Sequence, residues 1–129
     1  MMSYYLSKTI NMQFEEAIPF LEGELKKEGF GILTEIDMKD TLRKKLDVDF
    51  RKYKILGACN PQYAHKALLT EDKIGVLLPC SFIVQELEPG RVEIACINPE
   101  VAMEEVENKQ MVNIASEVTQ KLTRVIEAL

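Results

Sequence analysis

The chain has 129 residues, of which 47% are hydrophobic and 29% charged, so we expect residues 1–129 to form one ordered domain with a single core. The net charge of −5 argues against nucleic-acid binding across the whole surface, and no apolar run approaches the roughly 20 residues that cross a bilayer, which argues against a membrane-spanning helix. The N-terminus shows no leader-like pattern. The chain has three cysteines, at positions 59, 80 and 96, and this odd number lacks the CxxC spacing of a disulfide or zinc motif. The sequence therefore predicts a cytoplasmic protein with reduced thiols, and neither a disulfide framework nor a zinc ribbon.

The N-terminal segment predicts a strand followed by a helix. Residues 3–10 alternate with period two and are rich in aromatic and β-branched side chains, which is typical of a strand. Asn11 is a suitable N-cap for a helix over residues 12–28, whose apolar positions recur at spacings of three and four. Pro19 lies inside this helix and removes one backbone donor, so we expect either a bend there or a separate first turn.

A second strand and a charged helix come next. Gly29 supplies a left-handed helix end, and residues 30–37 have the pattern of a strand. Residues 37–46 carry a narrow apolar stripe on an otherwise charged segment, which predicts a short surface helix. This region holds a cluster of basic residues that we interpret as a solvated face, with an anion or nucleic-acid patch as the alternative. The cluster comprises Lys39, Arg43, Lys44, Lys45, Arg51, Lys52 and Lys54.

The longest apolar runs lie near the middle of the chain. Residues 53–58 and 74–78 are too short for a soluble helix and too apolar for a surface strand, so both are predicted to be buried strands. Between them, Asn60-Pro61 is suited to the N-cap and first position of a short helix over residues 61–69. Pro79 cannot donate to a strand ladder, so it either ends the 74–78 strand or lies at a bulge or an edge.

The C-terminal half predicts a hairpin and a long helix. Residues 80–87 continue as an extended segment, and the Pro-Gly pair at positions 89 and 90 predicts a type II turn. Residues 91–97 are then the second strand of a hairpin. Asn98-Pro99 opens the C-terminal helical region. The final helix has the clearest pattern and should lie along an antiparallel sheet. Its apolar stripe consists of Met111, Ile114, Ala115, Val118, Leu122, Val125, Ile126 and Leu129.

These elements predict an α+β fold with two layers, in which helices pack on one face of an antiparallel sheet and the C-terminal helix is long. Between residues 74 and 87, however, apolar side chains point to both faces of the sheet: Phe82 and Val84 to one, Ile83 and Leu87 to the other. The first and last helices can cover only one face. The other needs the short central helix or a second copy of the chain, so we expect a two-fold homodimer.

Two motifs, YKILGACNP at residues 53–61 and IGVLLPC at residues 74–80, resemble the domain of unknown function 302 family of bacteria and archaea. The GFGILTEID segment at residues 29–37 and the long terminal helix agree, so the resemblance covers essentially the whole chain. It implies a small two-layer α+β domain, commonly a homodimer, with no established activity. Ser81 stands where family members often carry asparagine, so this chain lacks a side-chain amide there.

The polar and soft residues around the two motifs define a candidate binding site. Cys59 lies just before a predicted helix N-terminus, where the partial positive charge favours a thiolate. Strand ends and helix N-termini are common places for ligands to meet such a fold. The ordinary interpretations are core packing for the cysteines, capping for Asn60 and a surface position for His65. The candidate residues are Cys59, Asn60, Pro61, His65, Pro79, Cys80 and Ser81.

The sequence identifies no reaction, and three hypotheses follow. The first is a module that binds a small ligand near the two motifs, or an apolar ligand between the terminal helix and the sheet. The second is a thiol-dependent enzyme or redox sensor that uses Cys59 with Cys80 as its resolving partner. The third is a dimeric structural module without a ligand. His65 is the only histidine that could serve Cys59 as a base, and no ligand spacing is diagnostic of a metal, so no metal or cofactor is assigned.

Overall fold

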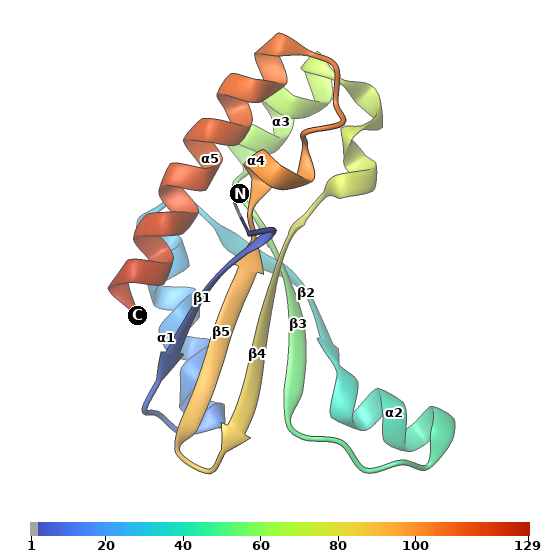
Figure 1. Cartoon of the computed structure of the whole chain (residues 1–129), viewed down its shortest axis with the longest axis vertical. Helices are drawn as coiled ribbons and strands as arrows, with labels where there is room; N and C mark the ends of the chain where they lie inside the picture. The colour runs from blue at the N-terminus through green and yellow to red at the C-terminus, as the bar shows by residue number, and fades with distance from the viewer. Residues whose placement is uncertain (1–2) are drawn as a thin grey trace.

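The computed structural model describes residues 3–129, and its centre is an antiparallel sheet of five strands in the order β1-β5-β4-β3-β2 (Figure 1). None of the described helices is long and apolar enough to cross a membrane. The strands are β1 (Tyr5–Ile10), β2 (Gly31–Asp37), β3 (Tyr53–Cys59), β4 (Cys80–Glu88) and β5 (Arg91–Ile97). The helices are α1 (Phe14–Lys27), α2 (Met38–Leu46), α3 (Pro61–Thr70), the 3₁₀ helix η1 (Asp72–Leu77), α4 (Pro99–Ala102) and α5 (Lys109–Ala128).

Helices α1 and α5 pack against one face of the sheet and enclose the main core. Leu21 and Leu25 of α1 and Leu122 of α5 are fully buried, because the apolar stripe of each helix faces the sheet. The alternation of β-strand side chains supplies the other half of this core. The predicted two-layer α+β fold with a long C-terminal helix is therefore confirmed. The strand residues in the core include Leu56, Ala58, Cys80, Phe82, Val84, Val92, Ile94 and Cys96.

The start of α1 differs from the prediction. The helix begins at Phe14 after Gln13, so the predicted start at residue 12 and the predicted cap at Asn11 are wrong. Phe14 is the first buried residue of the apolar face, and Gln13 has extended backbone angles at the N-cap position without a side-chain hydrogen bond. Pro19 lies inside α1, which continues across it as one helix.

The end of α1 follows the prediction. Gly29 adopts a positive φ of 85°, a conformation that glycine takes without a Cβ penalty. Its N–H donates to the carbonyl oxygen of Lys26, and the N–H of Phe30 donates to that of Leu25. This pair of bonds is a Schellman motif, and Phe30 and Leu25 are both buried in the main core. The helix end thus sets where β2 begins.

The predicted strand over residues 74–78 is wrong, because most of that segment belongs to η1. Glu71 accepts a hydrogen bond from the backbone N–H of Lys73 and starts this tight helix. A single short helix needs only a few apolar residues on its inner side, and here Ile74 is buried while Val76 is 85% exposed. The neighbour of β3 is instead β4, and Pro79 joins η1 to it.

A small group of helices gathers beyond one end of the sheet. Helix α3, η1, α4 and the first half of α5 lie there (Figure 1). Ala67, Ile74 and Met111 form a second buried cluster between them, and Ile114 packs against both this cluster and the main core. The helical group therefore forms a roof over the end of the sheet where β3 stops and β4 starts.

The face of the sheet opposite α1 and α5 carries a row of apolar side chains. The register aligns Ile36, Ile55, Ile83 and Ala95 in one row across β2, β3, β4 and β5. Ile36 is 47% exposed, and Ile55 and Ile83 are half-buried. The hairpin that joins β4 to β5 is as predicted, with Gly90 at a positive φ of 81°.

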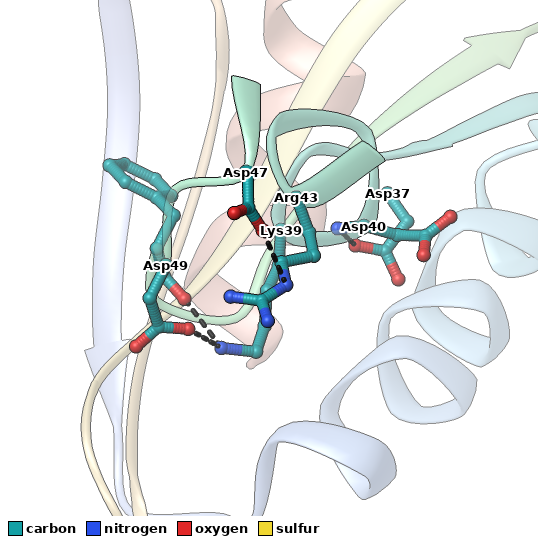
Figure 2. Close-up of polar contacts among 7 residues, drawn as sticks. Asp37, Lys39, Asp40, Arg43, Asp47 and Asp49 are labelled. Atoms are coloured by element: carbon teal, nitrogen blue, oxygen red, sulfur yellow. Dashed lines mark hydrogen bonds and ion pairs between the residues drawn. The ribbon is translucent and has the colours of Figure 1, made fainter. Parts of the chain in front are cut away.

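Helix α2 extends away from the rest of the chain and contains no buried residue (Figure 1). It starts one residue later than predicted because Asp37 is its N-cap, with a side chain that accepts from the N–H of Asp40. Figure 2 shows Lys39 and Arg43 of this helix beside Asp49 and Asp47. The ion pairs are Lys39–Asp49 at 2.9 Å, Lys44–Asp40 at 2.9 Å and Arg43–Asp47 at 3.4 Å.

Three more basic residues of this region also have side-chain partners. Lys52 pairs with Glu15 of α1, and Lys54 pairs with Glu35 of β2 at 2.8 Å. Arg51 donates to the side-chain oxygen of Gln85. Exposed ion pairs of this kind add little stability, but they offset the positive charge of five of the seven basic residues. The interpretation of the cluster as a solvated face is therefore favoured over an anion patch.

Candidate functional site

A cavity of about 310 Å³ lies between the end of the sheet and the helical roof. Its floor is formed where β3 ends and β4 begins, and its walls come from α3, α4 and α5. The lining is almost entirely apolar, which is the composition expected for a small-molecule site with few polar anchors. Lining residues include Phe30, Ala58, Ala64, Leu78, Met103, Ile114 and Val118.

Four of the seven candidate residues predicted from the sequence line this cavity: Cys59, Asn60, Pro79 and Cys80. The register explains why they meet. Ala58 pairs with Cys80 across β3 and β4, so the last residue of β3 and the first of β4 share one end of the sheet. The expected neighbourhood of the two motifs is therefore present, although the paired strand is β4 rather than residues 74–78.

The other three candidates lie outside the lining. Ser81 pairs with Gly57 and belongs to the opposite face of the sheet, because successive strand residues point to opposite sides. His65 is exposed on α3. Pro61 is exposed at the start of α3 and borders a separate polar hollow next to the cavity. His65, the base considered for Cys59, is therefore not among the residues that line the cavity with that thiol.

Asn60 holds the N-cap position of α3 but its side chain makes no capping hydrogen bond, so the predicted capping role is wrong. Its Nδ2 instead donates to the carbonyl oxygen of Glu28 at 3.2 Å. An unpaired carbonyl at a helix end needs a partner when it is shielded from water, and Asn60 is only 9% exposed. The side chain therefore fixes α3 to the end of α1. By contrast, Asn98 and Asn108 cap α4 and α5 with their side chains.

Gly57 allows the chain to approach closely beside the cavity. A Cβ atom there would lie 2.3 Å from Oγ1 of Thr34 and 2.6 Å from Cγ of Pro79. Both distances are shorter than any contact a real methyl group makes, so only glycine fits without movement of its neighbours. Gly57 thereby lets Pro79 lie against β3, next to the floor of the cavity.

The thiols differ in exposure. Burial, with the nearby Cys59 as a minor cause, raises the pKa of Cys80 to about 11. Burial also raises the pKa of Cys96 to about 12. Both side chains are therefore protonated near neutral pH and behave as small apolar groups. Cys59 is the partly exposed thiol of the three. Among residues 3–129, no three histidine, cysteine or acidic side chains group in a way that could hold a metal ion.

Sequence reasoning missed most of the apolar walls. Leu33 is the bulged residue of β2 and is 67% exposed, and Leu68 of α3 is 45% exposed, so these two mark the rim of the cavity. Tyr63 of α3 also lines the cavity. An exposed leucine such as Leu33 would point to the cavity rim only if the bulge in β2 were already known. The remaining lining residues come together because α3 packs against α5.

The sequence profile of the domain of unknown function DUF302 matches residues 6–129. The chain belongs to the DUF302 family. The crystal structure of an uncharacterized conserved DUF302 protein from Bacillus stearothermophilus is similar to it, with a TM-score of 0.89 and 28% sequence identity over 98% of each chain. No curated protein matches the chain. The family match confirms the resemblance to this family that the two motifs indicated. The family is described by its domain and carries no assigned activity.

Proposed function

We propose that this DUF302 protein is a cytosolic, homodimeric module that binds a small apolar ligand in the cavity beneath α3 and α5. The cavity itself carries this proposal. At about 310 Å³ it is at the lower end of the range of about 300–1,000 Å³ for small-molecule sites. The three free cysteines fit a reducing compartment.

The energetic argument rests on the lining. Water inside an apolar cavity finds few hydrogen-bond partners, so an apolar ligand can replace it at little polar cost. The few polar or soft groups in the walls are Asn60, Tyr63, Met103 and the thiols of Cys59 and Cys80. Few polar anchors favour recognition by shape and apolar area over recognition by a dense hydrogen-bond network.

A neutral fluorescent probe tests this proposal. We expect 1-aminoanthracene to bind the wild-type protein with enhanced fluorescence. Ala64→Phe places a ring into the cavity from α3, where Ala64 is half-buried, and should weaken binding at least tenfold. His65→Phe is the matched control, because it adds the same ring at the exposed neighbouring position. A folded Ala64→Phe variant that binds the probe like the wild type would overturn the proposal.

Thiol chemistry at Cys59 is the second candidate. It is favoured by the position of this partly exposed thiol in the cavity wall, directly before α3. The raised pKa of Cys80 counts against Cys80 as an attacking thiolate. Alkylation by iodoacetamide at pH 7, followed by mass spectrometry of each cysteine, tests this function. A Cys59 rate well above that of a free thiol is expected, and a rate no faster would exclude it.

The homodimer is proposed from the apolar row on the opposite face of the sheet. Ile55 and Ile83 are central in this row, and Tyr5 and Tyr53 flank it. A second copy related by a two-fold axis would bury the same row on both subunits. Because this face lies away from the cavity floor, the dimer and the ligand site are separate parts of the proposal.

A further inference from the structure

The polar hollow beside the apolar cavity shares two wall residues with it. Asn60 and Tyr63 line both spaces. On one side of them lies the apolar cavity, and on the other lies a hollow bordered by Lys27, Glu28 and Lys121. One molecule that occupies both spaces would have an apolar body on one side of this pair of residues and a polar end on the other.

The charges in the hollow favour an anionic end. The carboxylate of Glu28 is held by Arg124, with its Oε1 3.0 Å from Nη2, whereas Nζ of Lys121 is 3.9 Å from the same oxygen. Lys27 is paired with Glu24 at 2.9 Å. The carboxylate of Glu28 therefore faces two cations, Lys121 and Arg124. Arg124, the closer of the two, already forms an ion pair with it. Lys121 keeps most of its capacity to bind an anion.

Tyr63 brings this charge to the boundary of the cavity. Nζ of Lys121 lies 5.9 Å from the centre of the Tyr63 ring, and Nζ of Lys66 lies 5.4 Å from it. Both distances are within the range of cation–π attraction. The same aromatic ring thus borders the apolar cavity and lies near two ammonium groups, an arrangement that suits an amphiphile.

We infer that the ligand is an amphiphile whose hydrocarbon part fills the cavity and whose carboxylate or similar anionic head lies in the hollow beside Lys121. This inference rests on the proposed function, since it names the ligand class for the same site. The cavity of about 310 Å³ is at the lower end of the range for small-molecule sites, so a hydrocarbon chain of medium length, such as a decyl chain, is a suitable first probe.

Decanoate and decanol test this inference, because they share the chain and differ in the charge of the head. Displacement of bound 1-aminoanthracene gives the affinity of each. Lys121→Gln should weaken decanoate about fivefold, the upper value for a partly exposed charge pair, and should leave decanol unchanged. Lys109→Gln, an exposed lysine on the same helix, is the control with the same change in net charge. Raising the salt concentration should weaken decanoate binding to the wild type.

The outcomes separate the two proposals. If 1-aminoanthracene and both decyl compounds fail to bind, the proposed function fails and this inference falls with it. If the dye binds but decanoate does not displace it, the ligand class is wrong while the cavity remains a binding site. If Lys121→Gln weakens both decyl compounds equally or neither of them, the anionic head does not lie beside Lys121 and the inference is overturned.

Discussion

Asn60 donates a hydrogen bond from Nδ2 to the carbonyl oxygen of Glu28, and this contact of 3.2 Å joins residues 32 positions apart. It connects the N-cap residue of α3 to the C-cap residue of α1. Asn60 lines both the cavity and the polar hollow, so this bond holds a wall residue of both spaces in place. The amide of Asn60 is therefore a structural donor.

Substitutions at Asn60 separate a donor role from a capping role. Asn60→Ala should lower the free energy of unfolding by about 1–2 kcal/mol, because a shielded carbonyl loses its partner. Asn60→Asp keeps a good N-cap acceptor but cannot donate, so it should cost at least as much as alanine. Urea denaturation measures both. An aspartate variant as stable as the wild type would show that capping, not donation, matters.

Substitution of Gly57 tests the close approach beside the cavity. Gly57→Ala should destabilise the protein by about 1–3 kcal/mol, since its methyl group would overlap Thr34 and Pro79. Gly23→Ala is the control, because no atom lies within 4 Å of a Cβ there and the position is in the interior of α1. The control should raise stability by up to about 1 kcal/mol. Thermal denaturation followed by circular dichroism compares the two.

The buried thiols predict a loss of stability in alkaline solution. Burial raises the pKa of Cys80 to about 11 and that of Cys96 to about 12, while the same thiols ionise near their ordinary pKa in the unfolded chain. Above that ordinary pKa the unfolded state has lost more protons, so the free energy of unfolding falls as pH rises. The slope is at most about 1.4 kcal/mol per pH unit for each thiol.

Urea denaturation between pH 8 and pH 10.5 measures this slope. A variant with Cys80→Ala and Cys96→Ala should lose most of it, although it starts from a lower stability at pH 8 because two buried side chains are shortened. The single variant Cys59→Ala is the control, since Cys59 is partly exposed. An unchanged slope in the double variant would assign the alkaline instability to other groups.

The proposed homodimer predicts that a charge at the centre of the apolar row disrupts assembly. Ile83→Glu should convert the dimer into a folded monomer, because the carboxylate would be buried without a partner in the interface. Val112→Glu on the exposed side of α5 introduces the same charge away from the sheet and should leave the dimer intact. Light scattering coupled to gel filtration measures the mass. A wild-type chain that is monomeric at micromolar concentration contradicts the proposal.

Short-range patterns in the sequence were enough to predict much of this fold. The stripe of α5, the glycine that ends α1 and the Pro-Gly turn between β4 and β5 are each set by residues within a few positions of one another. For the same reason the junctions that follow Cys59 and precede Cys80 could be recognised as a candidate site. Local signals failed where a short apolar run fits two structures, as in η1, whose inward face needs only one buried isoleucine.

The tertiary structure decided which residues the cavity contains. Ser81 carried a candidate role in the sequence, but the pleat of β4 directs it to the other face of the sheet. Tyr63 and Ile114 enter the cavity because α3 and α5 pack together over the end of the sheet, and their spacing in the chain does not encode that contact. Asn60 has the sequence signature of a cap, yet the carbonyl of Glu28 competes for its side chain. Secondary structure depends on neighbours in sequence, whereas a cavity depends on how separate elements pack.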